Sequence, residues 1–177
     1  MPKDLKILFA NMNRQNSALT MILQTSRADI LLIQEPWWGK LVPKCSDSNL
    51  EGIEMLGTCC HSEWETFLPP AAPSLLHPHV TIFLQKSLSP FISISVLNKL
   101  TSYTCLGLRL DTSPPIFIIN FYHHIIDHKS SLDLLLQHPL PSGPLIIGGD
   151  FNTHSPHWSP SDLPTSSWAH TLEDWLE

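Results

Sequence analysis

The chain has 177 residues, of which 42% are hydrophobic and 15% are charged. This composition is typical of a globular domain with a real core and argues against a disordered chain. The formal charge is −6, from ten Lys and Arg against sixteen Asp and Glu. The length suits one domain. No basic excess is available to neutralise a phosphate backbone, so we expect this domain to bind nucleic acid only weakly in isolation.

The cysteine pattern and the first residues of the chain indicate the cellular compartment. The four cysteines form no Cys-x-x-Cys pair, which favours reduced thiols over a zinc site or a disulfide framework. The first residues contain no apolar core long enough for a signal peptide, and no apolar run reaches the length of a membrane-spanning helix. We therefore expect an intracellular, soluble protein without a membrane partner.

The N-terminal part predicts a strand–helix–strand unit. Residues 5–11 alternate as a strand does, and Ser17 is placed to cap a helix that runs to about Ser26. A second strand at 29–34 leads to Glu35, where the following proline stops further pairing. Residues 36–52 are predicted to be loop.

The rest of the chain alternates short strands with two helices. β-branched and aromatic runs predict strands at 53–60, 80–84, 92–97, 103–110 and 116–121. Helices are predicted at 127–137 and 165–176, on either side of a buried strand at 145–147 that two glycines end.

Polar side chains follow three of these strands at the point where each strand ends. Asn11 and Asn13 follow the first strand, Glu35 the second, and Asp150 and Asn152 the strand at 145–147. If the extended conformation continues, Asp150 and Asn152 point to the same side. Oxygen ligands of this kind suit Mg²⁺, which usually takes one or two carboxylates. Polar turns are the alternative at each position, and Asn11 and Asn13 in particular are common turn formers.

Four segments resemble a known family, the endonuclease/exonuclease/phosphatase superfamily, and more narrowly the apurinic-type endonuclease domain of non-LTR retrotransposons. These segments occur in the family's order and cover nearly the whole chain: Asn11-Met12-Asn13-Arg14, Leu32-Ile33-Gln34-Glu35-Pro36, Ile118-Ile119-Asn120-Phe121-Tyr122 and Gly148-Gly149-Asp150-Phe151-Asn152. The segment at 154–159 is similar to the retroelement branch.

The resemblance implies a fold, a site and a reaction. The fold would be an α+β, four-layered α/β sandwich of the DNase I type, with residues 1–177 forming one domain. Glu35 and Asn13 would hold Mg²⁺ or Mn²⁺. Asp150 would position or deprotonate the attacking water, while Asn152 and Tyr122 would contact the phosphate. The substrate would be DNA, nicked to leave a 3′-hydroxyl.

One family motif is missing from the sequence. The resembling domains continue with further strands and close with a Ser-Asp-His motif, which this chain lacks. We therefore expect a domain that is incomplete at its C-terminus and lacks the last strands. Two alternatives to a DNA endonuclease remain open, a catalytically inactive truncated relic and a small-phosphoester phosphatase. A retained retroelement role would imply a reverse transcriptase domain in a parent polyprotein and a nuclear location.

Overall fold

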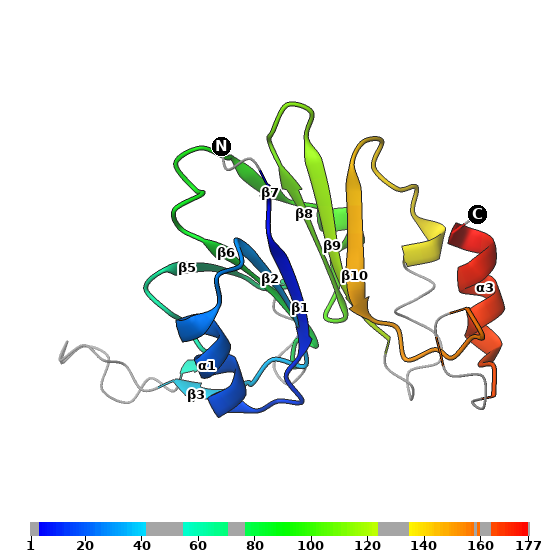
Figure 1. Cartoon of the computed structure of the whole chain (residues 1–177). Helices are drawn as coiled ribbons and strands as arrows, with labels where there is room; N and C mark the ends of the chain where they lie inside the picture. The colour runs from blue at the N-terminus through cyan, green and yellow to red at the C-terminus, as the bar shows by residue number, and fades with distance from the viewer. Residues whose placement is uncertain are drawn as a thin grey trace.

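Two four-stranded sheets form the body of the protein (Figure 1). The computed structural model describes residues 4–41, 55–70, 77–123, 135–157, 159 and 164–176. The first sheet has the order β1 (Ile7–Asn11), β2 (Ile30–Gln34), β6 (Val80–Gln85), β5 (Trp64–Phe67). The second has the order β10 (Leu145–Asp150), β9 (Ile116–Tyr122), β8 (Cys105–Leu110), β7 (Ile94–Val96). A small hairpin pairs β3 (Gly39–Leu41) with β4 (Met55–Gly57).

Each large sheet contains one parallel pair, and these pairs decide where polar strand ends gather. β1 runs parallel to β2, with Asn11 opposite Gln34. β10 runs parallel to β9, with Asp150 opposite Tyr122. Because parallel strands end at the same edge of their sheet, each sheet presents two of its carboxyl ends together.

The sheets pack face to face, and helices cover their outer faces. Aliphatic residues of β2, β6, β8 and β9 fill the space between the sheets. Helix α1 (Asn16–Thr25) packs on the outer face of the first sheet through Leu19 and Leu23. Helix α3 (Ser167–Leu176) packs on the outer face of the second through Leu172. This arrangement confirms the predicted α+β sandwich of four layers.

Burial on both faces explains why the central strands read as apolar runs. All five residues of β2 are buried, since α1 covers one face and the second sheet covers the other. The same holds for β9, where six of seven residues are buried. Strands covered on both faces lose the alternation of polar and apolar residues.

Several predicted boundaries are wrong. α1 begins at Asn16, and the residue at its N-cap is Gln15, whose side chain forms no cap hydrogen bond. Ser17 therefore lies inside the helix. The glycines at 148 and 149 do not end β10, which runs on to Asp150 because both pair with β9.

Two short strands were not predicted, and one predicted helix is described only in part. β3 lies within the predicted loop at 36–52, of which 42–52 is outside the described residues, and β5 pairs with β6 at the end of the first sheet. The 3₁₀ helix η2 (Asn98–Leu100) follows β7. Of the predicted helix at 127–137, residues 127–134 lie outside the described residues and 135–137 are helical.

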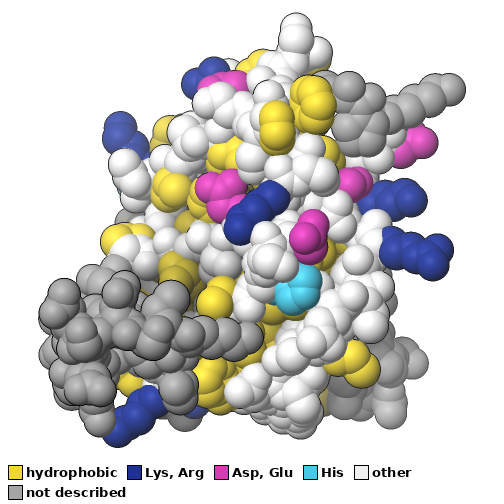
Figure 2. Space-filling view, turned by 90° about the vertical axis from the view of Figure 1, so that its left-hand side faces the viewer, with side chains coloured by type: hydrophobic (Ala, Val, Ile, Leu, Met, Phe, Trp, Pro, Cys, Tyr) yellow, Lys and Arg dark blue, Asp and Glu magenta, His cyan; other side chains and the backbone are white. Residues whose placement is uncertain are grey.

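Charge is dispersed on the one face of the molecule that Figure 2 shows. On the face shown in Figure 2, the Lys and Arg side chains are spread out rather than gathered in one basic patch. Within the described part of the chain, no helix combines the length and apolar character that a membrane crossing needs.

Candidate active site

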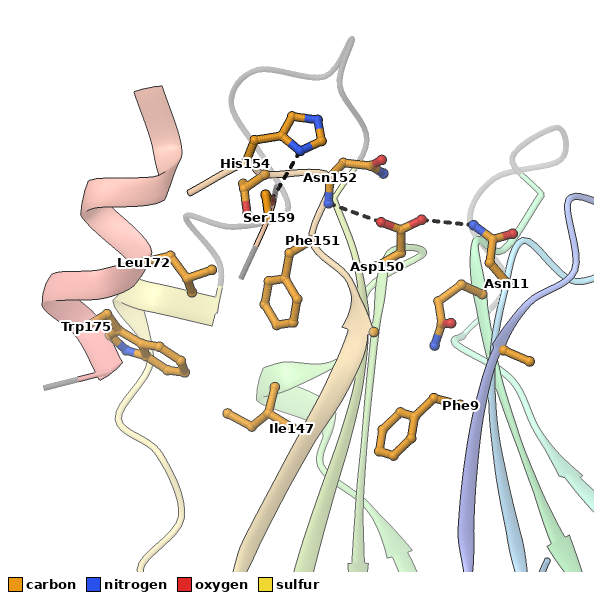
Figure 3. A pocket seen from close by; sticks show the side chains of 14 residues that line it. Phe9, Asn11, Ile147, Asp150, Phe151, Asn152, His154, Ser159, Leu172 and Trp175 are labelled. Carbon is orange, nitrogen blue, oxygen red and sulfur yellow. Dashed lines mark hydrogen bonds between the residues drawn. The ribbon is translucent and has the colours of Figure 1, made fainter. Parts of the chain in front are cut away.

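A hydrogen bond between Asn11 and Asp150 joins the two sheets at their polar strand ends. Asn11 ends β1 in the first sheet, and Asp150 ends β10 in the second. The Asn11 Nδ2 atom donates to Asp150 Oδ2 at 2.9 Å, across 139 positions of sequence (Figure 3). This contact brings together two of the strand ends that the sequence marked as polar.

Asp150 is held through its second oxygen as well. The backbone N–H of Asn152 donates to Asp150 Oδ1 at 3.1 Å. Asn152 has a left-handed backbone, with φ 46°, so the extended conformation ends at Asp150 and strand alternation does not place the Asn152 side chain. Instead, its Nδ2 donates to the carbonyl of His123 at 2.8 Å. Both oxygens of Asp150 therefore accept hydrogen bonds that fix the orientation of the carboxylate.

Glu35 and Tyr122 form a second contact between the sheets. The Tyr122 hydroxyl donates to Glu35 Oε1 at 3.0 Å. Burial first, and then the bond to Glu35 and the charges of Glu35 and Asp150, raise the pKa of Tyr122 to about 12. The hydroxyl therefore stays protonated, as a donor, throughout the neutral range.

The backbone around Glu35 is fixed in an uncommon conformation. Glu35 has φ 45°, in the left-handed region that residues with a side chain seldom adopt. Its N–H donates to the carbonyl of His79 at 2.8 Å, and its carbonyl accepts from the N–H of Arg14 at 2.9 Å. Left-handed φ values at Asn13 and Arg14 turn the chain after β1 toward this carbonyl. Such conformations persist where surrounding contacts hold them, and they concentrate at functional sites.

The buried side-chain amides of Gln34 and Asn120 support the site from the interior of the sandwich. Asn120 is fully buried, and Gln34 is 3% exposed. Gln34 Nε2 donates to Asn120 Oδ1 at 2.5 Å, and Asn120 Nδ2 donates to the carbonyls of Ile33 and Thr81, each at 2.9 Å. Asn120 lies two residues before Tyr122, and Gln34 one residue before Glu35. The amides thus fix the two strands relative to one another directly beneath the site.

The paired glycines of β10 allow close approach on both sides. A Cβ atom at Gly149 would lie 1.9 Å from the backbone oxygen of Phe121. A Cβ atom at Gly148 would lie 1.6 Å from the ring of Phe9 on β1. Glycine is therefore required at position 149, where the neighbour is backbone, whereas a side chain at position 148 would displace the ring of Phe9.

A cavity of about 770 Å³ opens beside Asp150. Its polar wall includes Asn11, Asp150 and Asn152, and its apolar wall includes Phe9 and Trp175 (Figure 3). A polar anchor beside an apolar wall is typical of sites that bind organic ligands.

Oxygen donors at the junction could hold a divalent metal. Among the described residues, no three His, Cys, Asp or Glu side chains lie close enough together to hold a metal. Glu35 and Asp150 supply carboxylate oxygens, and Asn11 adds an amide oxygen. Magnesium suits such a set, since it keeps several of its own waters and needs only one or two carboxylates.

The predicted site residues are placed as follows. Asp150, Asn152, Tyr122 and Glu35 lie at the junction of the two sheets. Of these, only Asp150 and Asn152 line the cavity. Asn13 is exposed and also lies outside the cavity lining, although its backbone N–H donates to Asn11 Oδ1 at 2.8 Å. Its role as a metal ligand stays a prediction.

From the sequence, Asn11 was predicted to be a polar strand end, but no role in the site was assigned to Asn11, Gln34 or Asn120. Asn11 contacts Asp150 directly, because β1 ends there and the chain turns away at Met12. The contacts of Gln34 and Asn120 were also unforeseen. The available signal was a single amide inside an otherwise apolar strand, which requires a buried partner.

Comparison with known proteins identifies a family and similar solved structures. The model of the Endonuclease/Exonuclease/phosphatase family matches residues 7–175. The endonuclease domain of TRAS1, a telomere-specific non-LTR retrotransposon, has a similar structure with a TM-score of 0.64 and 18% sequence identity. The match covers 98% of this chain and 69% of that chain, and it shows a shared fold. No curated protein sequence matches this chain.

Proposed function

The chain belongs to the Endonuclease/Exonuclease/phosphatase family, and we propose that its site hydrolyses phosphodiester bonds in DNA with the help of a divalent metal. The observation that carries the proposal is the junction of two carboxylate-bearing strand ends. Asp150 is bonded to Asn11 across the two sheets, and Glu35 is bonded to Tyr122 in the same way. The fold shared with a retrotransposon endonuclease supports DNA as the substrate.

Each residue of the junction has a distinct role in the proposed reaction. Glu35 is the main carboxylate for the metal, with the predicted help of Asn13. Magnesium or manganese, when bound, polarises a phosphoryl oxygen and stabilises the leaving alkoxide. Asp150 orients the attacking water and accepts its proton. Asn152, whose Nδ2 donates to the carbonyl of His123 and whose side chain also bonds Tyr122, would donate to a phosphate oxygen once substrate is present.

The products follow from in-line attack. The water oxygen bonds to phosphorus as the bond from phosphorus to the 3′ oxygen breaks, which leaves a 3′-hydroxyl and a 5′-phosphate. The Tyr122 hydroxyl can donate a hydrogen bond, because its raised pKa keeps it protonated. Fixed donors around the phosphate stabilise the charge that develops in the transition state.

The proposed context is a retroelement. A 3′-hydroxyl at a nick can prime reverse transcription, so the partner would be a reverse transcriptase domain in a parent polyprotein, acting in the nucleus. The formal charge of −6 implies that DNA affinity depends on that larger protein or on low salt.

A plasmid-nicking assay tests the proposal. The purified chain is incubated with supercoiled plasmid in Mg²⁺ or EDTA, beside Glu35→Ala and Asp150→Ala. Asp111→Ala is the matched control, because Asp111 is an exposed carboxylate paired with Arg109 at 2.8 Å. We expect Mg²⁺-dependent nicking that falls at least about 100-fold in both site variants and is unchanged in the control.

Two outcomes would contradict the proposal. If the folded wild-type chain leaves the plasmid supercoiled, the chain is an inactive relic of the family. If it releases phosphate from small phosphoesters and leaves DNA intact, the site belongs to a phosphatase. Circular dichroism of each variant confirms that a loss of activity is not a loss of fold.

A further inference from the structure

His79 lies directly opposite Glu35 at the edge of the first sheet. Gln34 pairs with Val80 in the antiparallel register of β2 and β6. Glu35, which follows Gln34, therefore faces His79, which precedes Val80. The carbonyl of His79 accepts the N–H of Glu35 at 2.8 Å, and its own N–H donates to the carbonyl of Tyr103 at 2.7 Å. The main chain of His79 therefore connects Glu35 to the segment that precedes β8.

The ring of His79 contacts the other half of the junction. It stacks on the ring of Tyr122 with centroids 5.0 Å apart and planes inclined by only 2°. The ring of Tyr103 packs against it as well, at 5.8 Å and 54°. A tyrosine has few ways to move when one face of its ring is covered, so this stack limits where the Tyr122 hydroxyl can lie.

We propose that His79 is a positioning residue that sets the Glu35 carboxylate and the Tyr122 hydroxyl relative to one another. Its main chain holds the left-handed backbone of Glu35, and its ring holds the ring that donates to Glu35 Oε1. The inference rests on the proposed function, because it assigns to Glu35 the binding of the metal. His79 itself touches neither metal nor substrate in this assignment.

Two substitutions isolate the contribution of the ring. His79→Ala removes the stack and keeps the main-chain bond to Glu35, whereas His79→Phe keeps both a flat ring and the main-chain bond. His61→Ala is the matched control, since His61 lies before β5 and bonds the backbone N–H of Glu63. We measure Mn²⁺ affinity by electron paramagnetic resonance, plasmid nicking, and the ring signals of ¹³C-labelled tyrosine.

The tyrosine signals report the stack directly. The chain has two tyrosines, and a Tyr103→Phe sample assigns the signals of Tyr122. We expect His79→Ala to shift the Tyr122 ring signals and to weaken both Mn²⁺ binding and nicking by about tenfold, the size of one aromatic pair. His79→Phe should restore all three, and His61→Ala should change none.

The results separate this proposal from the proposed function. Wild-type protein that binds Mn²⁺ but does not nick DNA contradicts the nuclease proposal, while Mn²⁺ affinity still decides the role of His79. Unchanged Mn²⁺ affinity in His79→Ala, or an equal loss in His79→Phe, overturns the positioning role. So does wild-type protein that binds no Mn²⁺, because Glu35 would then hold no metal to position.

Discussion

Replacing Asn120 by aspartate tests whether the buried amides hold the site together. The substitution keeps the shape of the side chain but exchanges an NH₂ donor for an oxygen. That oxygen would face the carbonyls of Ile33 and Thr81, which now accept hydrogen bonds of 2.9 Å each. Asn120 is fully buried, so water cannot replace the lost donors.

The expected loss of stability follows from those two bonds. A buried polar group left without its partner costs about 1–3 kcal/mol, so two carbonyls give a loss of roughly 2–6 kcal/mol in Asn120→Asp. A domain has only about 5–15 kcal/mol of total stability. The variant should therefore unfold at a much lower urea concentration than the wild-type protein, and its nicking activity should fall with it.

The stability of Asn120→Asp should fall as pH rises. Burial disfavours a charged carboxylate, so the folded-state pKa of the new aspartate should lie above its unfolded value of about 3.9. The native variant then binds a proton that the unfolded chain has lost, and its stability falls as pH rises from about 4 through the folded-state pKa. Urea unfolding of variant and wild type at pH 5 and pH 8 should therefore show a larger difference at pH 8.

Asn98→Asp is the matched control, because Asn98 is exposed at the start of η2. It should change the unfolding free energy by less than about 0.5 kcal/mol. If Asn120→Asp is as mild as this control, or shows no dependence on pH, the buried amides do not support the site as argued.

Three further predictions concern burial, packing and the sheet edge. Burial raises the pKa of Cys105 from 9.0 to about 12. Between these values the native state keeps a proton that the unfolded chain loses, so the free energy of unfolding should fall by up to about 4 kcal/mol as pH rises from 9 to 12. Urea unfolding should show a shallower fall in Cys105→Ala, and the exposed Cys60→Ala should behave as wild type. Gly149→Ala should lower the free energy of unfolding by about 1–3 kcal/mol, because the new Cβ meets the backbone of Phe121. The melting temperature and the nicking rate should both fall, and an unchanged melting temperature contradicts this. Leu8 is 38% exposed on β1, which pairs only with β2 among the described strands. We expect this sheet edge to let the wild-type chain self-associate, and Leu8→Lys to reduce that association in sedimentation velocity. Equal association of the two proteins contradicts a role for this edge.

β2 was predictable because it is buried on both faces, whereas β10 is only half-buried along most of its length and was recognised from its short apolar run. β2 and β10 appear in the sequence as apolar runs followed by a carboxylate, and the structure places Glu35 and Asp150 after these runs as expected. Two of the short strands, β3 and β5, were not predicted, although the equally short β4 and β7 were. β3 has three residues and β5 has four, and such strands depend on a partner strand more than on their own pattern.

The partners of the site residues were beyond the reach of sequence patterns. Asn11 and Asn13 differ by two positions, and only the end of β1 decides which of them meets Asp150. Gln34 and Asn120 are 86 positions apart, so no local pattern pairs them. The single polar residue in the apolar run at 116–121 predicts that a partner exists, but tertiary structure alone identifies it.

The supporting contacts bear on the choice between an enzyme and a relic. A chain that had only inherited its fold would need the aliphatic core between the sheets and little else. Here the junction also keeps an amide on Asp150, a hydroxyl on Glu35 and a left-handed backbone at Glu35 itself. The left-handed residue costs stability, and a buried amide pair gives less stability than an apolar pair of the same shape would. These features are therefore better explained by the chemistry of the site than by folding. They support the proposed phosphodiester hydrolysis over the alternative of an inactive relic.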